Sequence, residues 1–180
     1  LQHRLPQAVL ERLEAHLASL ARLAAGCRPG RPEGWQPLLA ERDRLLVLSP
    51  LRRGPWGVEA IHRTLLPDAG APAAWPEGLP VLCTRNLPAL GLANGDVGVL
   101  VGAPGAQERQ LVFGGEEPLW VHPAQLAGAA EPALALTVHK AQGSEAREVI
   151  VLLGGDDPGP RLLYTALTRA RERALLITAP

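Results

Sequence analysis

The sequence contains no methionine, and Lys140 is the only lysine among its 18 basic residues. A Walker A loop needs a glycine–lysine pair followed by serine or threonine, because its lysine reaches the β- and γ-phosphates of a nucleotide. Lys140 lies between His139 and Ala141, so the chain has no such loop and is not a complete P-loop ATPase. Since position 1 also lacks methionine, we expect an excised piece of a longer protein.

Cysteine, net charge and long apolar runs are also scarce, and each absence excludes a class of protein. Cys27 and Cys83 make neither a disulfide framework nor a zinc cluster, so we expect buried thiols and a reducing, cytoplasmic setting. No apolar run approaches the ~18 residues of a membrane span. The charges of the 18 acidic and 18 basic residues cancel, so the net charge gives no indication of a nucleic-acid partner. The histidines lack metal-ligand spacing and the acidic residues form no clustered metal site, so we expect no metal.

Hydrophobic periodicity predicts an α/β fold that starts with a helical segment. Residues 1–43 contain an amphipathic helix at 6–25 and a short helix near 35–42. A strand at 44–48, a loop and a helix at 57–66 form the repeating unit of a parallel sheet. The same pattern returns after residue 131, with strands at 133–138, 148–153 and 174–178 and a helix at 162–172.

A different pattern interrupts the parallel one between residues 75 and 130. Short β-like runs follow one another closely there, separated by turns such as Asn94-Gly95-Asp96, at 81–86, 96–102, 109–113 and 119–122. Closely spaced short strands are typical of a small antiparallel barrel. We therefore expect an α/β domain at 44–74 and 131–180 with a small β-barrel inserted at 75–130.

The polar segment 137–145, Thr-Val-His-Lys-Ala-Gln-Gly-Ser-Glu, is the first candidate for a functional site. It follows an apolar strand directly, which places it at the carboxyl end of that strand, where open α/β sheets bind ligands. Gly143 could permit a close backbone approach. The alternative is an ordinary polar loop with a turn glycine.

Arginines supply the second and third candidates. Arg169 and Arg173 are four residues apart and would share a helix face, where they could bind phosphate or simply complement the helix dipole. Arg52 and Arg53 follow the first strand in a loop rich in glycine and proline, and the alternative for them is a surface turn.

An apolar strand at 149–153 followed by Asp156 and Asp157 is similar to a Walker B strand. Gly154 and Gly155 displace the two acids from the strand end, and there is no Walker A loop to partner them. We therefore predict a turn at Asp156–Pro160 rather than a magnesium site.

These segments together resemble the superfamily 1 helicases. Residues 137–145 resemble motif V and residues 164–171, Tyr-Thr-Ala-Leu-Thr-Arg-Ala-Arg, resemble motif VI. Residues 52–57 resemble motif IV of one branch, and residues 86–98 resemble the segment that opens the inserted barrel of that branch. The branch is the RecD family, which includes the alpha subunits of exodeoxyribonuclease V.

The resemblance implies a RecA-like motor domain, called 2A, with an inserted SH3-like barrel, called 2B. In this family ATP and Mg²⁺ bind mainly to an N-terminal motor domain, which would explain the missing Walker A loop. By position, Arg169 would be the arginine finger of motif VI and Arg52 the motif IV contact to the γ-phosphate. Gly143 and Glu145 would lie near the nucleotide, with Glu145 meeting the ribose. We expect Arg169 on the same edge of the sheet as the turn that starts at Thr137, and the motor interpretation depends on this placement.

The resemblance also implies partners. Thr137 and His139, and more weakly Lys140, would touch the backbone of single-stranded DNA during 5′ to 3′ translocation in recombination and repair. RecB-like and RecC-like subunits are the expected protein partners. Two alternatives stay open: a non-catalytic module that binds single-stranded nucleic acid, and the motor half of another RecD-like or relaxase-linked helicase.

Overall fold

The structure, a computed structural model, describes residues 4–31, 33–66, 68, 70–155 and 157–179. The chain divides into two compact units, one within residues 1–14, 43–67 and 134–180 and the other within residues 15–42 and 68–133. The division falls inside the first helix, α1 (Gln7–Ala25). The sequence analysis set residues 1–43 apart as one segment, whereas the structure shares these residues between the two units.

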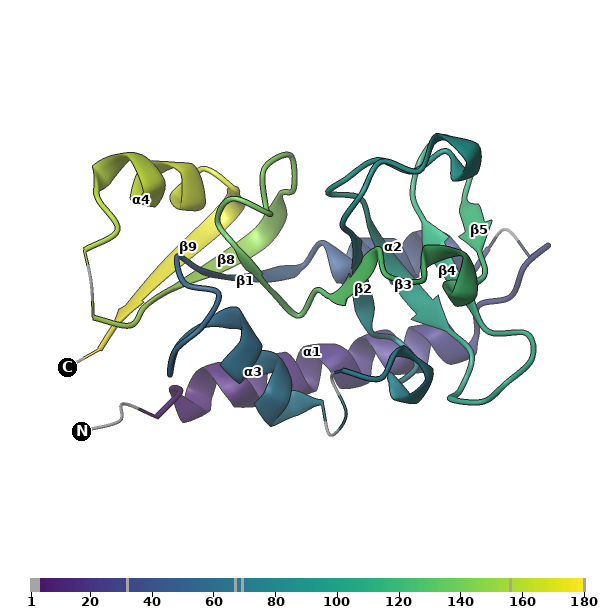
Figure 1. Ribbon diagram of the computed structural model, residues 1–180, viewed down its shortest axis with the longest axis horizontal. Coiled ribbons are helices and arrows are strands. Elements are labelled where there is room, and N and C mark those ends of the chain that lie inside the picture. The colour runs from purple at the N-terminus through teal and green to yellow at the C-terminus, as the bar shows by residue number, and fades with distance from the viewer. Residues whose placement is uncertain (1–3, 32, 67, 69, 156, 180) are drawn as a thin grey trace. The chain divides into compact units, whose positions relative to one another are not determined.

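The first unit contains a four-stranded parallel sheet, sheet A, in the order β7-β1-β8-β9. Its strands are β1 (Leu45–Ser49), β7 (Ala135–Thr137), β8 (Ala146–Leu153) and β9 (Ala170–Thr178). All of β1 is buried, as expected for a strand covered on both faces. In Figure 1, helix α4 (Pro160–Leu167) lies above these strands and helix α3 (Val58–Leu65) lies below them. The predicted parallel α/β architecture is confirmed.

The helix predicted at 162–172 is wrong in its second half. Helix α4 ends at Leu167, and β9 begins at Ala170 and pairs with β8. Alanine, arginine, glutamate and leucine all favour helices individually, but the strand pairing decides the structure here. Arg169 therefore follows the helix end and Arg173 lies in a strand, so the two do not share a helix face.

The second unit contains a five-stranded antiparallel sheet, sheet B, in the order β5-β4-β3-β2-β6. Its strands are β2 (Pro80–Cys83), β3 (Val97–Val101), β4 (Gln110–Phe113), β5 (Leu119–Val121) and β6 (Ala130–Pro132), of which β6 was not predicted. Among the described residues no pairing joins β5 to β6, so closure into an SH3-like barrel stays a prediction. Among the described residues, a short 3₁₀ turn at Pro72–Ala74 precedes β2, and two more, at Pro88–Leu90 and Pro123–Leu126, connect strands.

The core of the second unit is formed by helices packed against strands β3 and β4. The later part of α1 and the whole of α2 (Trp35–Arg42) supply apolar side chains to one cluster with these strands: Leu20, Ala24, Cys27, Trp35, Leu38, Leu39, Val99, Val101 and Val112. The two cysteines are fully buried, as predicted, and burial raises the pKa of the Cys27 thiol. In the part of the chain that the structure describes, no helix is both long and apolar enough to span a bilayer.

Candidate functional site: the two edges of the parallel sheet

Strands β1 and β7 end side by side and define the carboxyl edge of sheet A. Ser49, the last residue of β1, pairs with Thr137, the last residue of β7. The Val138 amide then donates to the Ser49 carbonyl at 3.2 Å. The loop that carries Arg52 and the turn that carries His139 therefore leave the sheet from neighbouring strands. This edge is where open α/β sheets bind ligands.

The loop after β1 is held in a defined shape by its own backbone. The Glu59 amide donates to the Arg52 carbonyl at 3.0 Å, and the Ser49 hydroxyl accepts from the Leu51 amide at 3.1 Å. A Cβ atom on Gly57 would lie 2.6 Å from the Arg53 carbonyl carbon, so this close approach requires glycine. The loop thus presents Arg52 and Arg53 from a fixed backbone.

Glu59, in the first turn of α3, pairs with both of these arginines. Its carboxylate lies 3.0 Å from the Arg52 Nε and 3.6 Å from the Arg53 Nε. The hydrogen bond from Arg52 and the charge of Arg53 hold the pKa of Glu59 below its ordinary value. The side chains of Arg52 and Arg53 are 55% and 85% exposed, so a phosphate can approach both.

The turn after β7 carries the predicted DNA-binding residues. The Thr137 hydroxyl accepts from the Lys140 amide at 3.3 Å, and the Thr137 carbonyl accepts from the Ala141 amide at 3.0 Å. Val138 and Ala141 are buried and anchor the turn, whereas His139 is exposed and Lys140 is half-buried. The structure therefore brings Thr137, His139 and Lys140 together with the Arg52 loop on one edge.

The rest of the 137–145 segment does not stay at that edge, which corrects our expectation. It runs without a helix directly into β8, a strand parallel to β7, and so must return to the amino end of the sheet. Gly143 takes a left-handed conformation with φ of +88° on this path. Gly143 and Glu145 therefore lie toward the start of β8, at what we call the amino edge.

Arg169 lies at the amino edge with them, not at the edge of Thr137, so the placement on which the sequence interpretation depended is wrong. The Ala146 amide donates to the Arg169 carbonyl at 3.0 Å, which places Glu145 and Arg169 at the starts of neighbouring strands. The Arg169 Nε donates to the Thr165 carbonyl at 3.2 Å. Among the described residues neither Nη atom of Arg169 has a hydrogen-bond partner. A guanidinium held by Nε with both amino groups available suits an anion such as phosphate.

Three further ion pairs link β8 and β9 near this edge. Arg171 donates from Nε to Glu145 Oε2 at 3.0 Å, and Arg147 donates from Nε to Glu172 Oε1 at 2.9 Å. Glu148 pairs with Arg173 of the same strand pair and with Arg12 of α1. Burial raises the pKa of Glu148, but its interactions with Arg173 and Arg12, including the charges of both, together lower it by more, so it lies below the ordinary value. Sequence reasoning missed these pairs, because they join residues 25 or more positions apart.

Arg52 and Arg169 are not brought together. Leu48 pairs with Val151, which is five residue steps along β8 from Ala146, or roughly 16 Å at ~3.3 Å per residue. Arg52 lies beyond that level at the carboxyl edge, and Arg169 lies at the amino edge. The two arginines predicted to meet one γ-phosphate therefore occupy opposite edges.

The segment similar to a Walker B strand forms a turn where the structure describes it. The Asp157 carboxylate accepts from the Gly159 amide at 2.9 Å, the geometry of an Asx turn, while Asp156 lies outside the described residues. Within the described ranges, no group of three histidine, cysteine, aspartate or glutamate side chains is arranged to hold a metal ion.

Comparisons with known proteins agree with the motifs. The sequence model of the UvrD-like helicase C-terminal domain family matches residues 132–177. The RecBCD enzyme subunit RecD of Mycobacterium tuberculosis is 36% identical over 148 residues, covering 77% of this chain and 25% of that protein. The ATP-dependent RecD2 DNA helicase of Deinococcus radiodurans is 35% identical over 142 residues, covering 71% of this chain and 19% of that protein. The chain thus spans a quarter or less of the length of these two relatives.

A solved structure also resembles the chain at a distance. The structure of the Pif1 helicase from Bacteroides in complex with ADP-AlF3 and single-stranded DNA aligns with 98% of this chain and 50% of that chain. The sequences are 16% identical in this alignment, and the TM-score is 0.48.

Proposed function

We propose that this chain, a C-terminal part of a RecD-type superfamily 1 helicase, forms the half of an ATP-driven DNA motor that lacks the nucleotide-binding loop. Its sheet A unit would be the RecA-like 2A domain, and its sheet B unit the inserted 2B domain. The observation that carries the proposal is the hydrogen bond from the Ala146 amide to the Arg169 carbonyl, at 3.0 Å. It joins the residue that follows motif V to Arg169 within motif VI, so the backbones of Glu145 and Arg169 lie at the starts of neighbouring strands.

The amino edge is suited to complete a nucleotide site whose other wall is a separate motor domain. That domain would make most of the contacts to ATP and would bind the Mg²⁺ ion. The ion would neutralise charge on the phosphates. Phosphoryl transfer spreads negative charge over the transferred group, and an arginine supplied from across an interface stabilises it. Arg169 would serve as this arginine, Glu145 would accept a hydrogen bond from the ribose, and Gly143 would permit a close approach. Without the other domain, we expect this chain to be inactive.

The carboxyl edge is suited to hold the DNA strand. Thr137, His139 and Lys140 lie there, and backbone contacts of this kind position a strand without reading its sequence. Arg52 was assigned to the γ-phosphate from the sequence, but its loop leaves β1 at this edge, where Ser49 pairs with Thr137. We therefore assign Arg52 to a phosphate of single-stranded DNA. ATP-driven closure of two motor domains would then move the strand 5′ to 3′.

We further propose that the whole protein acts in the cytoplasm in recombination and repair, as the RecD-like subunit of an exodeoxyribonuclease V. The similarity to RecD subunits supports this assignment, while the similarity to RecD2 supports a stand-alone helicase instead. Co-purification of the tagged full-length protein with RecB-like and RecC-like chains tests the first choice. A monomeric helicase that captures neither chain would establish the second.

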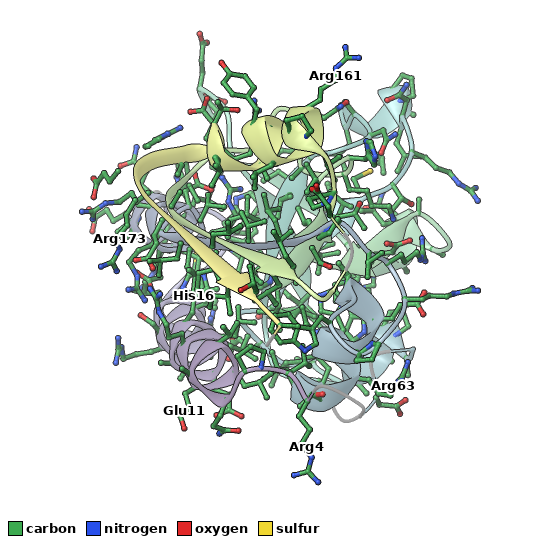
Figure 2. The ribbon with its side chains drawn as sticks, turned by 90° about the vertical axis from the view of Figure 1, so that its left-hand side faces the viewer. Arg4, Glu11, His16, Arg63, Arg161 and Arg173 are labelled. Atoms are coloured by element: carbon green, nitrogen blue, oxygen red, sulfur yellow. The ribbon has the colours of Figure 1, made fainter. Side chains whose placement is uncertain are left out.

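Replacement of Arg169 by alanine in the full-length protein tests the motor proposal. We expect the ATPase kcat to fall by ~10³-fold, because the transition-state charge loses its arginine, with DNA affinity within twofold of the unchanged protein. Arg161→Ala is the matched control, because Arg161 is exposed on α4 and points away from the sheet (Figure 2).

Two outcomes would contradict the motor proposal. A near-normal kcat in the Arg169→Ala protein would show that Arg169 is not the arginine finger. Loss of DNA binding in that variant, with little change in kcat, would instead support a non-catalytic module that binds single-stranded nucleic acid.

A further inference from the structure

The ion pair between Arg171 and Glu145 joins the two motifs that the proposed function places at the nucleotide. We propose that Arg171 is a positioning residue, which holds the Glu145 carboxylate in the orientation that accepts a ribose hydroxyl. This inference rests on the proposed function, because it gives Glu145 the role of a ribose contact. Arg171 itself would not touch the nucleotide.

An irregularity in β9 brings Arg171 to this partner. Ala146 pairs with Ala170 and Glu148 pairs with Arg173, so β9 advances three residues while β8 advances two. In a regular strand, neighbouring side chains point to opposite faces. Here the neighbours Arg171 and Glu172 pair with two side chains two positions apart, Glu145 just before β8 and Arg147 within it. A β-bulge re-aims side chains in this way, and bulges are frequent beside active sites.

The geometry of the pair leaves Glu145 half available. The Arg171 Nε donates to Oε2 at 3.0 Å, whereas Oε1 accepts no hydrogen bond within the described part of the chain. An ionised carboxylate only accepts hydrogen bonds, so its remaining oxygen suits a hydroxyl donor. A carboxylate that is already held loses less side-chain freedom when it binds a ligand, so binding is stronger.

The exposure of the pair separates a positioning role from a structural one. The side chains of Arg171 and Glu145 are 59% and 49% exposed. Ion pairs this exposed contribute little to folding. Loss of Arg171 should therefore change nucleotide binding while leaving the unfolding temperature unchanged.

Replacement of Arg171 by glutamine in the full-length protein tests the inference through steady-state ATPase kinetics. We expect the KM for ATP to rise by roughly 3- to 10-fold, because the Glu145 side chain must then be immobilised when the nucleotide binds. The kcat should stay within twofold. Arg171→Lys should recover part of the lost affinity, because it keeps the charge. Comparison of ATP with 2′-deoxy- and 3′-deoxy-ATP should show that the preference for one hydroxyl shrinks in Arg171→Gln.

A matched control and a double variant make the test specific. Arg147→Gln removes a neighbouring pair of similar length, with side chains 60% and 58% exposed, and should leave KM unchanged. In a Glu145→Gln background, Arg171→Gln should have no further effect on KM, because Arg171 acts through that carboxylate. An equal rise in KM with Glu145 already replaced would overturn the inference.

Failure of the inference differs from failure of the proposed function. If Arg169→Ala loses activity and Glu145→Gln raises KM, but Arg171→Gln changes nothing, only the positioning role is wrong. If neither Arg169→Ala nor Glu145→Gln changes the kinetics, the amino edge does not bind nucleotide. The inference about Arg171 and the proposed function are then both wrong.

Discussion

Each edge of the parallel sheet contains a carboxylate held between two arginines, and the two clusters differ in burial. At the amino edge, Glu148 lies between Arg12 and Arg173 with 14% of its side chain exposed. At the carboxyl edge, Glu59 lies between Arg52 and Arg53 with 37% exposed. Both carboxyl groups have a pKa below the ordinary value, but burial opposes the shift more strongly at Glu148.

The difference in burial indicates different roles for similar chemistry. A buried charge is costly unless it is paired, so the Glu148 cluster must stay intact in the folded protein, where it ties α1 to β8 and β9. The Glu59 cluster is open to water, where ion pairs are weak and can be exchanged for other anions. We therefore interpret the first cluster as structural and the second as part of a binding surface.

The largest effect outside the nucleotide site is expected for Glu148→Gln. The change leaves Arg12 and Arg173 facing an uncharged amide and should lower the free energy of unfolding by about 1–2 kcal/mol at neutral pH, discounted because both arginines reach solvent. Urea unfolding of the chain at several pH values measures this loss.

The pH dependence of that loss has a definite sign. The folded pKa of Glu148 lies below the unfolded value of ~4.3, so its stabilising contribution is present above that pH. The contribution disappears as pH falls through the folded pKa, where the unchanged protein and the variant should converge. A difference that persists in strong acid would show that the loss comes from packing, not charge.

The sequence predicted most elements because their patterns are local. The periodicity of α1 and the apolar runs of β1 and β8 predicted elements within two residues of the observed bounds. The helix at 162–172 was overextended because residues 170–173 favour helices one by one, whereas the partner that makes them a strand is β8.

The candidate site was harder to predict, because it depends on which way the chain runs between strands. Thr137 was placed correctly at the end of its strand, by position alone. Glu145 was assigned to the same edge because nothing in the 137–145 segment signals a crossover to the start of β8. The Arg171–Glu145 pair depends on a bulge, and a one-residue shift in register is invisible in a single sequence.

Arg52→Ala should have the next largest effect, on the binding of single-stranded DNA. Removal of one phosphate contact should weaken binding of an oligonucleotide by ~10-fold and reduce the slope of log K against log salt by about 1. At saturating DNA, the ATPase kcat should stay within twofold. Fluorescence anisotropy over a range of salt concentrations measures the slope.

The sequence-based alternative for Arg52 gives the opposite result. If Arg52 reached the γ-phosphate, kcat would collapse and the salt slope would stay unchanged. Such a result would contradict the assignment of DNA to the carboxyl edge and of nucleotide to the amino edge.

The smallest expected effect is a gain in DNA affinity when the carboxylate of the carboxyl edge is neutralised. Glu59 neutralises part of the charge that Arg52 and Arg53 offer, so Glu59→Gln should strengthen binding of single-stranded DNA by about twofold and steepen the salt slope. Because the pKa of Glu59 is lowered, its carboxylate stays ionised in the unchanged protein, and the gain should be constant between about pH 6 and 8. Glu145→Gln removes a comparably exposed carboxylate from the amino edge and should leave DNA affinity unchanged. Equal gains from both substitutions would mean that DNA responds only to net charge, with no preference for the carboxyl edge.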